Sequence, residues 1–82
     1  MNPQDKGPRA YVLLEIQPGK ENEFRDYVLS RNLLVSSKEE RMDFVHGTFD
    51  FVIILRGAMK DIDGRIMEIR KSPFVVKTET LI

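Results

Sequence analysis

The sequence predicts a single α+β domain with the element order β-α-β-β-α-β. Short runs rich in branched and aromatic residues occur four times, and two longer segments with apolar residues three and four positions apart lie between them. Glycine and proline separate most of these segments. A length of 82 residues fits one domain. This order predicts the ferredoxin-like arrangement, with four antiparallel strands and two helices on one face of the sheet.

The first strand is expected over residues 10–16, AYVLLEI, an apolar run that the turn sequence QPGK closes. The pattern changes from Glu21 onward. Phe24, Tyr27 and Val28 recur at helical spacing, and charged residues occupy the positions between them. This spacing is typical of an amphipathic helix with one apolar face.

The second strand is expected from about Glu39 to His46. Residues 33–35, LLV, either complete the packing of the first helix or lead into this strand. The hydrophilic run SSKEER, residues 36–41, is interpreted as a solvated connection. A third strand is expected over residues 49–57, FDFVIILRG, because the run is apolar on both faces and ends at glycine. Its apolar character indicates a central position in the sheet.

The second helix is expected in the segment that starts at Met59, where apolar residues recur at helical spacing and Pro73 ends the pattern. The apolar positions are Met59, Ile62, Ile66 and Ile69. The last strand is expected over residues 74–82, FVVKTETLI, which alternate and are rich in threonine. Such a strand suits the edge of a sheet.

The strands predict two apolar faces, although two helices cover only one. Phe49, Phe51, Ile53 and Leu55 share one face of the third strand, while Val52 and Ile54 share the other, and Tyr11 and Leu13 oppose Val12, Leu14 and Ile16 in the first strand. A chain this short has no third layer to offer. We therefore expect a second copy to pack its sheet against this one, as in a dimeric α/β barrel.

Composition excludes several classes of function. Thirteen basic and thirteen acidic residues give a formal net charge of zero, which removes the general electrostatic attraction to nucleic acid. No run of apolar residues reaches the roughly 18 that span a bilayer, and the N-terminal residues 1–9, MNPQDKGPR, form a polar segment expected to be flexible. The absence of cysteine fits a reducing cytoplasm. The sequence predicts a cytoplasmic protein without membrane contact.

Three stretches of the chain resemble the effector-binding (RAM) domain of the Lrp/AsnC family of feast/famine transcription regulators. They are AYVLLEIQPGKENEF, VHGTFDFVIILRG and IDGRIMEIRKSPFVVKTETLI. The resemblance covers residues 10–82, and its most specific part is a Gly-x-aromatic-Asp turn followed later by Pro73 and a Thr-x-Thr sequence. Only nine polar residues precede the first strand, so the chain resembles the stand-alone type without a DNA-binding helix-turn-helix. Its first helix and the connection after it are longer than the family's.

The resemblance implies an oligomeric sensor that dimerises through its sheets, assembles into tetramers or octamers and binds an amino acid between dimers. It implies no cofactor and no direct DNA binding. The family's ligand contacts fall on the turn before the third strand and on the last strand. In this chain the matching positions are Gly47, Thr48, Phe49, Asp50, Thr78, Glu79 and Thr80.

The chemistry of a zwitterion is consistent with these residue types. Asp50 or Glu79 would accept from the ammonium group, backbone N–H groups near Gly47 with a threonine hydroxyl would bind the carboxylate, and Phe49 would form an apolar wall. Each residue also has a structural interpretation. Gly47 suits a turn with positive φ, Asp50 can accept N–H groups of the turn, and threonines suit an edge strand.

Two other functions share the predicted fold. One is a small cofactor-free enzyme, a monooxygenase or isomerase of the dimeric α/β barrel type, with His46 or Asp50 as the base. No nucleophile–base pair is visible in the sequence, and a lone histidine is typical of a satisfied strand residue, so we expect no enzymatic activity and no metal site. The other is an assembly module that joins a full-length Lrp/AsnC regulator without a ligand of its own.

Overall fold

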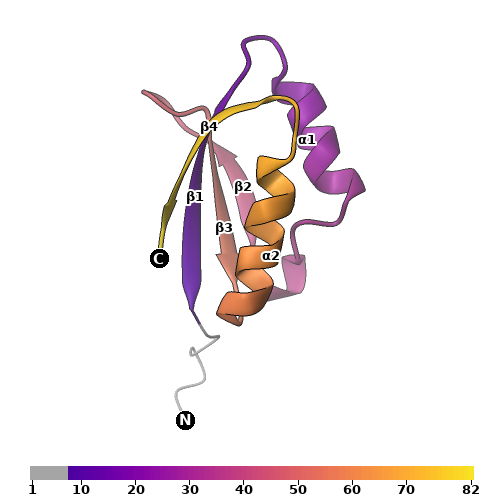
Figure 1. Cartoon of the computed structure of the whole chain (residues 1–82), viewed down its shortest axis with the longest axis vertical. Helices are drawn as coiled ribbons and strands as arrows, with labels where there is room; N and C mark the ends of the chain where they lie inside the picture. Colours follow the sequence, from indigo (N-terminus) through magenta and orange to yellow (C-terminus); the bar gives the residue numbers. More distant parts are fainter. Residues whose placement is uncertain (1–7) are drawn as a thin grey trace.

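The computed structural model of the chain describes residues 8–82 (Figure 1). Its strands are β1 (Arg9–Ile16), β2 (Arg41–Phe44), β3 (Phe51–Arg56) and β4 (Val75–Leu81), and its helices are α1 (Glu21–Ser30), α2 (Met59–Arg70) and a short 3₁₀ helix, η1 (Ser36–Lys38). The strands form one antiparallel sheet in the order β2-β3-β1-β4. The predicted ferredoxin-like α+β fold is confirmed.

The two longest apolar runs of the sequence occupy the centre of the sheet. β1 pairs with β3 from Arg9–Arg56 to Leu14–Phe51, and β4 lies along the other side of β1. β3 is therefore central and β4 is an edge strand, as the sequence predicts. None of the helices within residues 8–82 is long and apolar enough to cross a bilayer.

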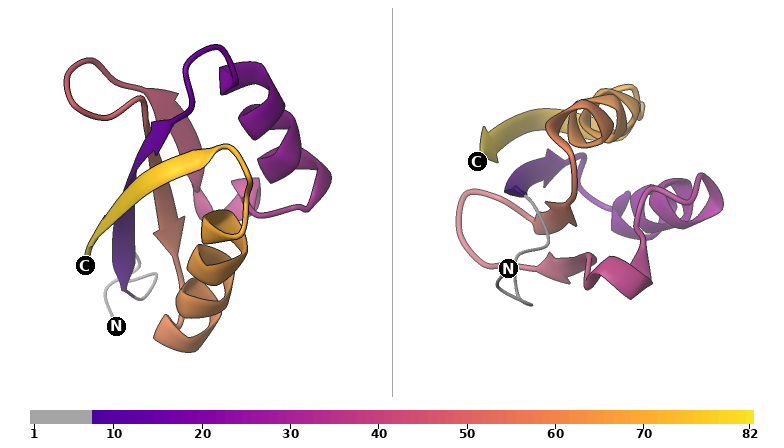
Figure 2. Two further views of the ribbon diagram at one scale, coloured as in Figure 1. Left: turned by 45° about the horizontal axis from the view of Figure 1, so that its top comes forward. Right: turned by 90° about the horizontal axis from the view of Figure 1, so that it is seen from below.

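Both helices lie on the same side of the sheet, which Figure 2 shows most clearly in the view from below. The core fills the space between these layers. Apolar residues of β1 and β3 alternate between buried and partly exposed, and the buried set meets the inward faces of α1 and α2. The largest fully buried side chains are Phe24, Phe51, Leu14, Ile53, Leu55, Ile62, Ile69, Val12 and Val28.

The connection from α1 to β2 differs from the expected one. Leu33 is buried and Leu34 packs against the core, so this segment completes the packing of the helix layer. The 3₁₀ turn and the left-handed backbone of Glu39, with a φ of 61°, then delay the strand. β2 starts at Arg41 and ends at Phe44, so the predicted strand from about Glu39 to His46 is too long.

A buried ion pair lies in the segment that the sequence predicts to be solvated. The Glu40 side chain is fully buried, and both of its oxygens accept from the Arg65 guanidinium of α2. The backbone N–H groups of Val35 and Arg56 donate to the same carboxylate at 2.7 and 2.9 Å. Burial raises the pKa of Glu40, but the hydrogen bonds from Arg65 and from these N–H groups outweigh it and hold the pKa below its ordinary value. Glu40 thus links the connection between α1 and β2 to β3 and to α2 by hydrogen bonds.

The ends of two predicted segments also shift. β3 begins at Phe51, so Phe49 belongs to the preceding loop and does not share a strand face with Phe51. Of the expected N-terminal segment 1–9, residues 1–7 lie outside the described residues, and Arg9 already belongs to β1.

Candidate functional site

The side of the sheet opposite the helices is apolar at its centre. Tyr11 and Leu13 of β1 stand opposite Ile54 and Val52 of β3, and all four are partly exposed between buried neighbours. Leu81 of β4 extends this patch beside Tyr11 and is 50% exposed. No helix within residues 8–82 lies on this side (Figure 2). We call these five residues the outer apolar patch.

A polar pair borders the patch at the β2 edge. Arg41 and Asp43 share the outer face because they stand opposite Ile54 and Val52. The Arg41 Nε lies 2.9 Å from the Asp43 Oδ2. The outer face therefore has an apolar centre and a charged rim, which is the usual layout of a protein–protein interface.

The loop of residues 45–50 projects from the sheet on this same side (Figure 2). Asp50 fixes the loop to β1. The Asp50 N–H donates to the carbonyl oxygen of Leu14 at 2.8 Å, and the Asp50 Oδ2 accepts from the N–H of Ile16 at 2.8 Å. The Asp50 carbonyl accepts from the N–H of Val45 at 3.0 Å. Asp50 thus has a structural role, but the expectation that its side chain accepts N–H groups of the turn is wrong, because the donor is Ile16 of β1.

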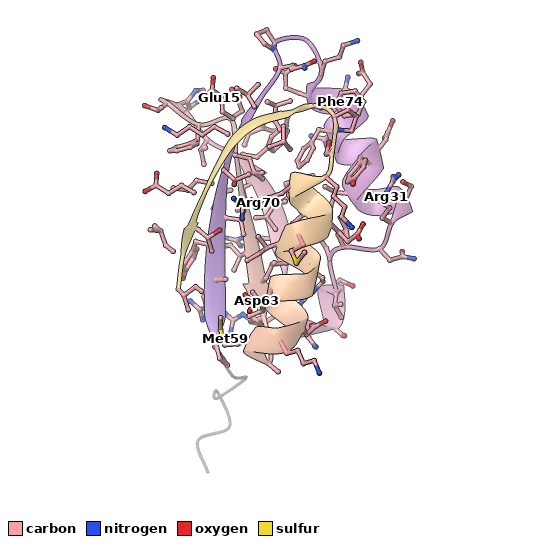
Figure 3. All side chains as sticks on the ribbon, viewed as in Figure 1. Glu15, Arg31, Met59, Asp63, Arg70 and Phe74 are labelled. Carbon is pink, nitrogen blue, oxygen red and sulfur yellow. The ribbon has the colours of Figure 1, made fainter. Side chains whose placement is uncertain are left out.

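Phe49 carries the loop across to β4. Its partly buried ring lies 6.0 Å from the Lys77 Nζ, measured to the ring centroid. Lys77 stands opposite Glu15 in the sheet, and Figure 3 shows Glu15 at the end of β1 nearest this loop. The two segments to which the resemblance assigns ligand contacts, the hairpin loop and the last strand, therefore lie side by side within one chain.

The tip of the loop is open. Gly47, Thr48 and the single histidine, His46, are exposed. Gly47 has a φ of 115°, and an added Cβ would meet no atom within 4 Å. The glycine is there because of its backbone conformation and not because another group approaches closely. Its N–H and that of Thr48 lie in a segment without regular secondary structure.

The three candidate residues of β4 do not share a face. Thr78 and Thr80 stand opposite Leu14 and Val12, whose side chains are buried beneath the helices. Glu79 stands opposite Leu13 and is exposed on the outer face. The loop and Glu79 are accordingly on one side of the sheet, while the two threonines lie on the other side.

At the outer corner of the sheet, beside the loop, the Phe49 ring centroid and the Lys77 Nζ lie 6.0 Å apart, Asp50 ends the same loop, and Glu79 follows Lys77 by two residues on the same face. Phe49 offers an aromatic surface, Lys77 a cation, and Glu79 and Asp50 carboxylates. The Asp50 Oδ2 is used by Ile16, whereas its other oxygen makes no hydrogen bond within residues 8–82. Lys77 is not among the site residues predicted from the sequence. The pairing of β4 with β1 places it beside the loop, and the only signal in the sequence is that Lys77 alternates with Thr78 and so lies on the same face as Glu79. Within the described residues, no group of three His, Cys, Asp or Glu could hold a metal ion.

Comparison with solved structures gives three informative similarities. FFRP-DM1 superposes with a TM-score of 0.72 and 28% identity, over 89% of this chain and 93% of that chain. The hypothetical protein PHS023 from Pyrococcus horikoshii gives 0.71 and 28%, over 89% and 84%. MtbAldR gives 0.63 and 14%, over 89% and 49%, which is a likeness of fold alone. No protein-family model and no curated protein sequence matches the chain.

FFRP-DM1 and MtbAldR are regulators of the Lrp/AsnC type. The resemblance found in the sequence is thus supported at the level of the fold, over most of the chain. The chain shares its fold with regulators of the Lrp/AsnC type, and this similarity supports a related regulatory domain.

Proposed function

We propose that this chain is an oligomeric effector-sensing domain that binds an amino acid, or a similar small zwitterion, beside the loop of residues 45–50. The observation that carries the proposal is the position of this loop. Asp50 fixes it to β1, and Phe49 brings it to β4, at the border of an uncovered apolar patch. A fixed loop beside an interface is a common place for a ligand site, because the scaffold positions groups that stay accessible.

The outer apolar patch is the proposed dimer surface. Tyr11, Leu13, Val52 and Ile54 form a continuous cross-strand group, and a second sheet packed on it would remove their remaining exposed area from water. Small domains bury too little surface to be very stable alone, so this packing would also stabilise the fold. A second copy completes the site as well, since the loop in one chain is open to solvent.

The recognition chemistry follows from the groups on the outer corner. The free Asp50 oxygen and the Glu79 carboxylate are the two acceptors for an ammonium group. The backbone N–H groups of the exposed residues 47 and 48 and the Lys77 ammonium are the proposed donors for a carboxylate. The Phe49 ring bounds the site on one side. The threonines on the helix side of β4 reach such a ligand only if it lies across the edge of the strand.

A regulatory role for a domain of this kind would require a DNA-binding partner. The alignment covers 49% of MtbAldR, so the unit shared with that regulator is about half of it. We propose that the present chain co-assembles with a full-length regulator through the same outer face. In this role it would change the ligand response of the mixed oligomer without contacting DNA itself.

A thermal-shift screen of the twenty amino acids tests the proposal. A ligand at 100 times its Kd stabilises the folded protein by about 2.7 kcal/mol, which raises the melting temperature measurably. Phe49→Ala should abolish the shift. Phe44→Ala is the matched control, because Phe44 is a phenylalanine of the same hairpin that is exposed but packs beside Phe51 and Arg25 on the helix side. No shift with any amino acid, in a protein with a cooperative melting curve, would contradict ligand binding.

A further inference from the structure

The second edge of β4 is open within residues 8–82. β4 ends the strand order β2-β3-β1-β4, so it pairs with β1 on one side only. The strand is seven residues long, whereas the opposite edge strand, β2, has four. A long unpaired edge presents a row of backbone N–H and C=O groups that can bond to another strand.

We infer that β4 pairs edge to edge with β4 of a second copy, antiparallel and with Thr78 at the two-fold axis. Thr78 is the midpoint of Val75–Leu81, and it lies within the part of the strand, Lys77 to Leu81, that pairs regularly with β1. It places Lys77 directly opposite Glu79 of the partner subunit, and Glu79 opposite the partner's Lys77. Opposite charges at directly facing positions stabilise a strand pair.

The charges select this register against its neighbours. Facing residues in an antiparallel pair lie on the same face of the sheet, so the pairing can slip only by steps that preserve the faces. Centring the pair on Lys77 brings two lysines face to face. Centring it on Glu79 does the same for two glutamates. A lone lysine on an edge strand discourages pairing, but a lysine two residues before a glutamate is complementary to its own copy.

Both charged groups also belong to the proposed ligand site, and Lys77 lies beside the Phe49 ring, so edge pairing and a bound ligand would compete for them. Neither Lys77 nor Glu79 makes an ion pair within residues 8–82. On the β1 side, Lys77 already stands opposite Glu15, so the pairing would continue an alternation of charge across the sheet. The β2 edge differs, because Arg41 and Asp43 satisfy each other at 2.9 Å and the strand is short.

The other face of β4 fits the same register. Val76, Thr78 and Thr80 are β-branched, and Val76 is 56% exposed. With Thr78 on the axis, the two Thr78 side chains face each other, whereas Val76 lies at the irregularity of the pairing with β1, where its face is not fixed by a partner in β1. β-branched pairs of this kind are favourable cross-strand neighbours. The helix side of the edge thus gains apolar and hydroxyl contacts while the outer side gains ion pairs.

This edge interface is separate from the outer apolar patch. The edge extends a sheet in its own plane, whereas the patch packs one sheet on another. Both are isologous, and two different isologous interfaces on one chain generate assemblies larger than a dimer. The inference goes beyond the proposed effector binding and needs no ligand.

Cysteine cross-linking tests the register directly, because the chain has no cysteine of its own. Facing Cα atoms on the axis are about 4.5–5.5 Å apart, which a disulfide can bridge. Oxidised Thr78→Cys should therefore form a covalent dimer on a denaturing gel. Thr80→Cys is the control, since two copies of residue 80 are about 14 Å apart in this register. Equal yields from Thr78→Cys and Thr80→Cys would overturn the register.

A charge swap tests the interface in solution, measured by light scattering without added amino acid. Lys77→Glu should halve the particle mass, because the new carboxylate at this position would then face Glu79 of the partner subunit. The double variant Lys77→Glu/Glu79→Lys should restore the mass. If the sheets also pack face to face, the mass should fall from four chains to two. If they do not, it should fall from two chains to one. The starting mass therefore tests the face-to-face packing of the proposed function, and the change in mass tests the edge pairing separately. An unchanged mass for Lys77→Glu would overturn the inference.

Discussion

The carboxylate of Asp50 accepts a hydrogen bond from the backbone N–H of Ile16 at 2.8 Å, across 34 residues of sequence. This contact fixes the candidate loop to the end of β1, where the register of β1 with β4 also shifts. A residue that the family resemblance offers as a ligand contact therefore also holds the loop in place. In the proposed site, ligand binding and loop geometry would share one side chain.

The first prediction concerns this contact. Asp50→Ala should lower the free energy of unfolding by about 1.5–3 kcal/mol, the usual range for a hydrogen bond to a charged group. Asp50→Asn should lower it less, because its amide oxygen still accepts from Ile16. Urea unfolding of both variants measures the difference. Equal stabilities of Asp50→Ala and the wild type would show that the contact contributes nothing.

The buried ion pair gives the second prediction. Arg65→Ala should lower the free energy of unfolding by about 3–5 kcal/mol, because it leaves the fully buried Glu40 carboxylate without its charge partner. Lys71→Ala is the control. It removes an exposed i,i+3 pair with Glu68, which is expected to change stability by less than about 0.5 kcal/mol. Similar losses in the two variants would refute the assignment of Glu40 as a buried anchor.

A pH dependence follows from the same group. The pKa of Glu40 is lower in the folded chain than its ordinary value of 4.5, so the unfolded chain binds the proton more tightly. The stability that Glu40 contributes is complete above pH 4.5 and is lost as the pH falls through the folded-state pKa. Glu40→Gln should flatten this part of the curve of stability against pH. A wild-type curve and a Glu40→Gln curve that run parallel between about pH 5 and pH 3 would contradict the prediction.

The formal net charge of zero leads to a prediction about nucleic acid. The chain should show no salt-sensitive affinity for duplex DNA, because too few basic groups are clustered to release counterions. A gel-shift titration at two salt concentrations checks this. A complex in the nanomolar range that weakens steeply with salt would be incompatible with the proposed indirect role in regulation.

The elements of the fold follow from the sequence because their apolar periods are strong. β1, β3 and the two helices appear where the spacing of their apolar residues predicts them. The start of β2 does not, since it depends on Glu40, whose burial requires Arg65 from a distant helix. Nothing in the local sequence SSKEER indicates that Glu40 is buried, because its partner, Arg65, lies 25 residues away.

The candidate site is predictable only in part for a similar reason. The resemblance points to the loop and to β4, and the contact of Phe49 with Lys77 brings these two segments together. The side of the sheet on which each β4 residue lies depends on the register with β1, including the irregularity beside Ile16. The alternation of side chains along β4 predicts that Glu79 and the two threonines lie on different faces of the sheet. Only the pairing of Glu79 with Leu13 shows that Glu79 is the one on the outer face.

The central claim is that a second copy of the chain packs on the outer apolar patch. The particle mass of the Leu13→Asp variant tests this claim most directly. Light scattering of the wild type should show at least two chains per particle, and Leu13→Asp should halve that mass by placing a charge at the centre of the patch. Leu29→Asp, at a residue 56% exposed on α1, should leave it unchanged, with circular dichroism confirming that each variant is folded. A wild type that is folded and monomeric at micromolar concentration would contradict the account.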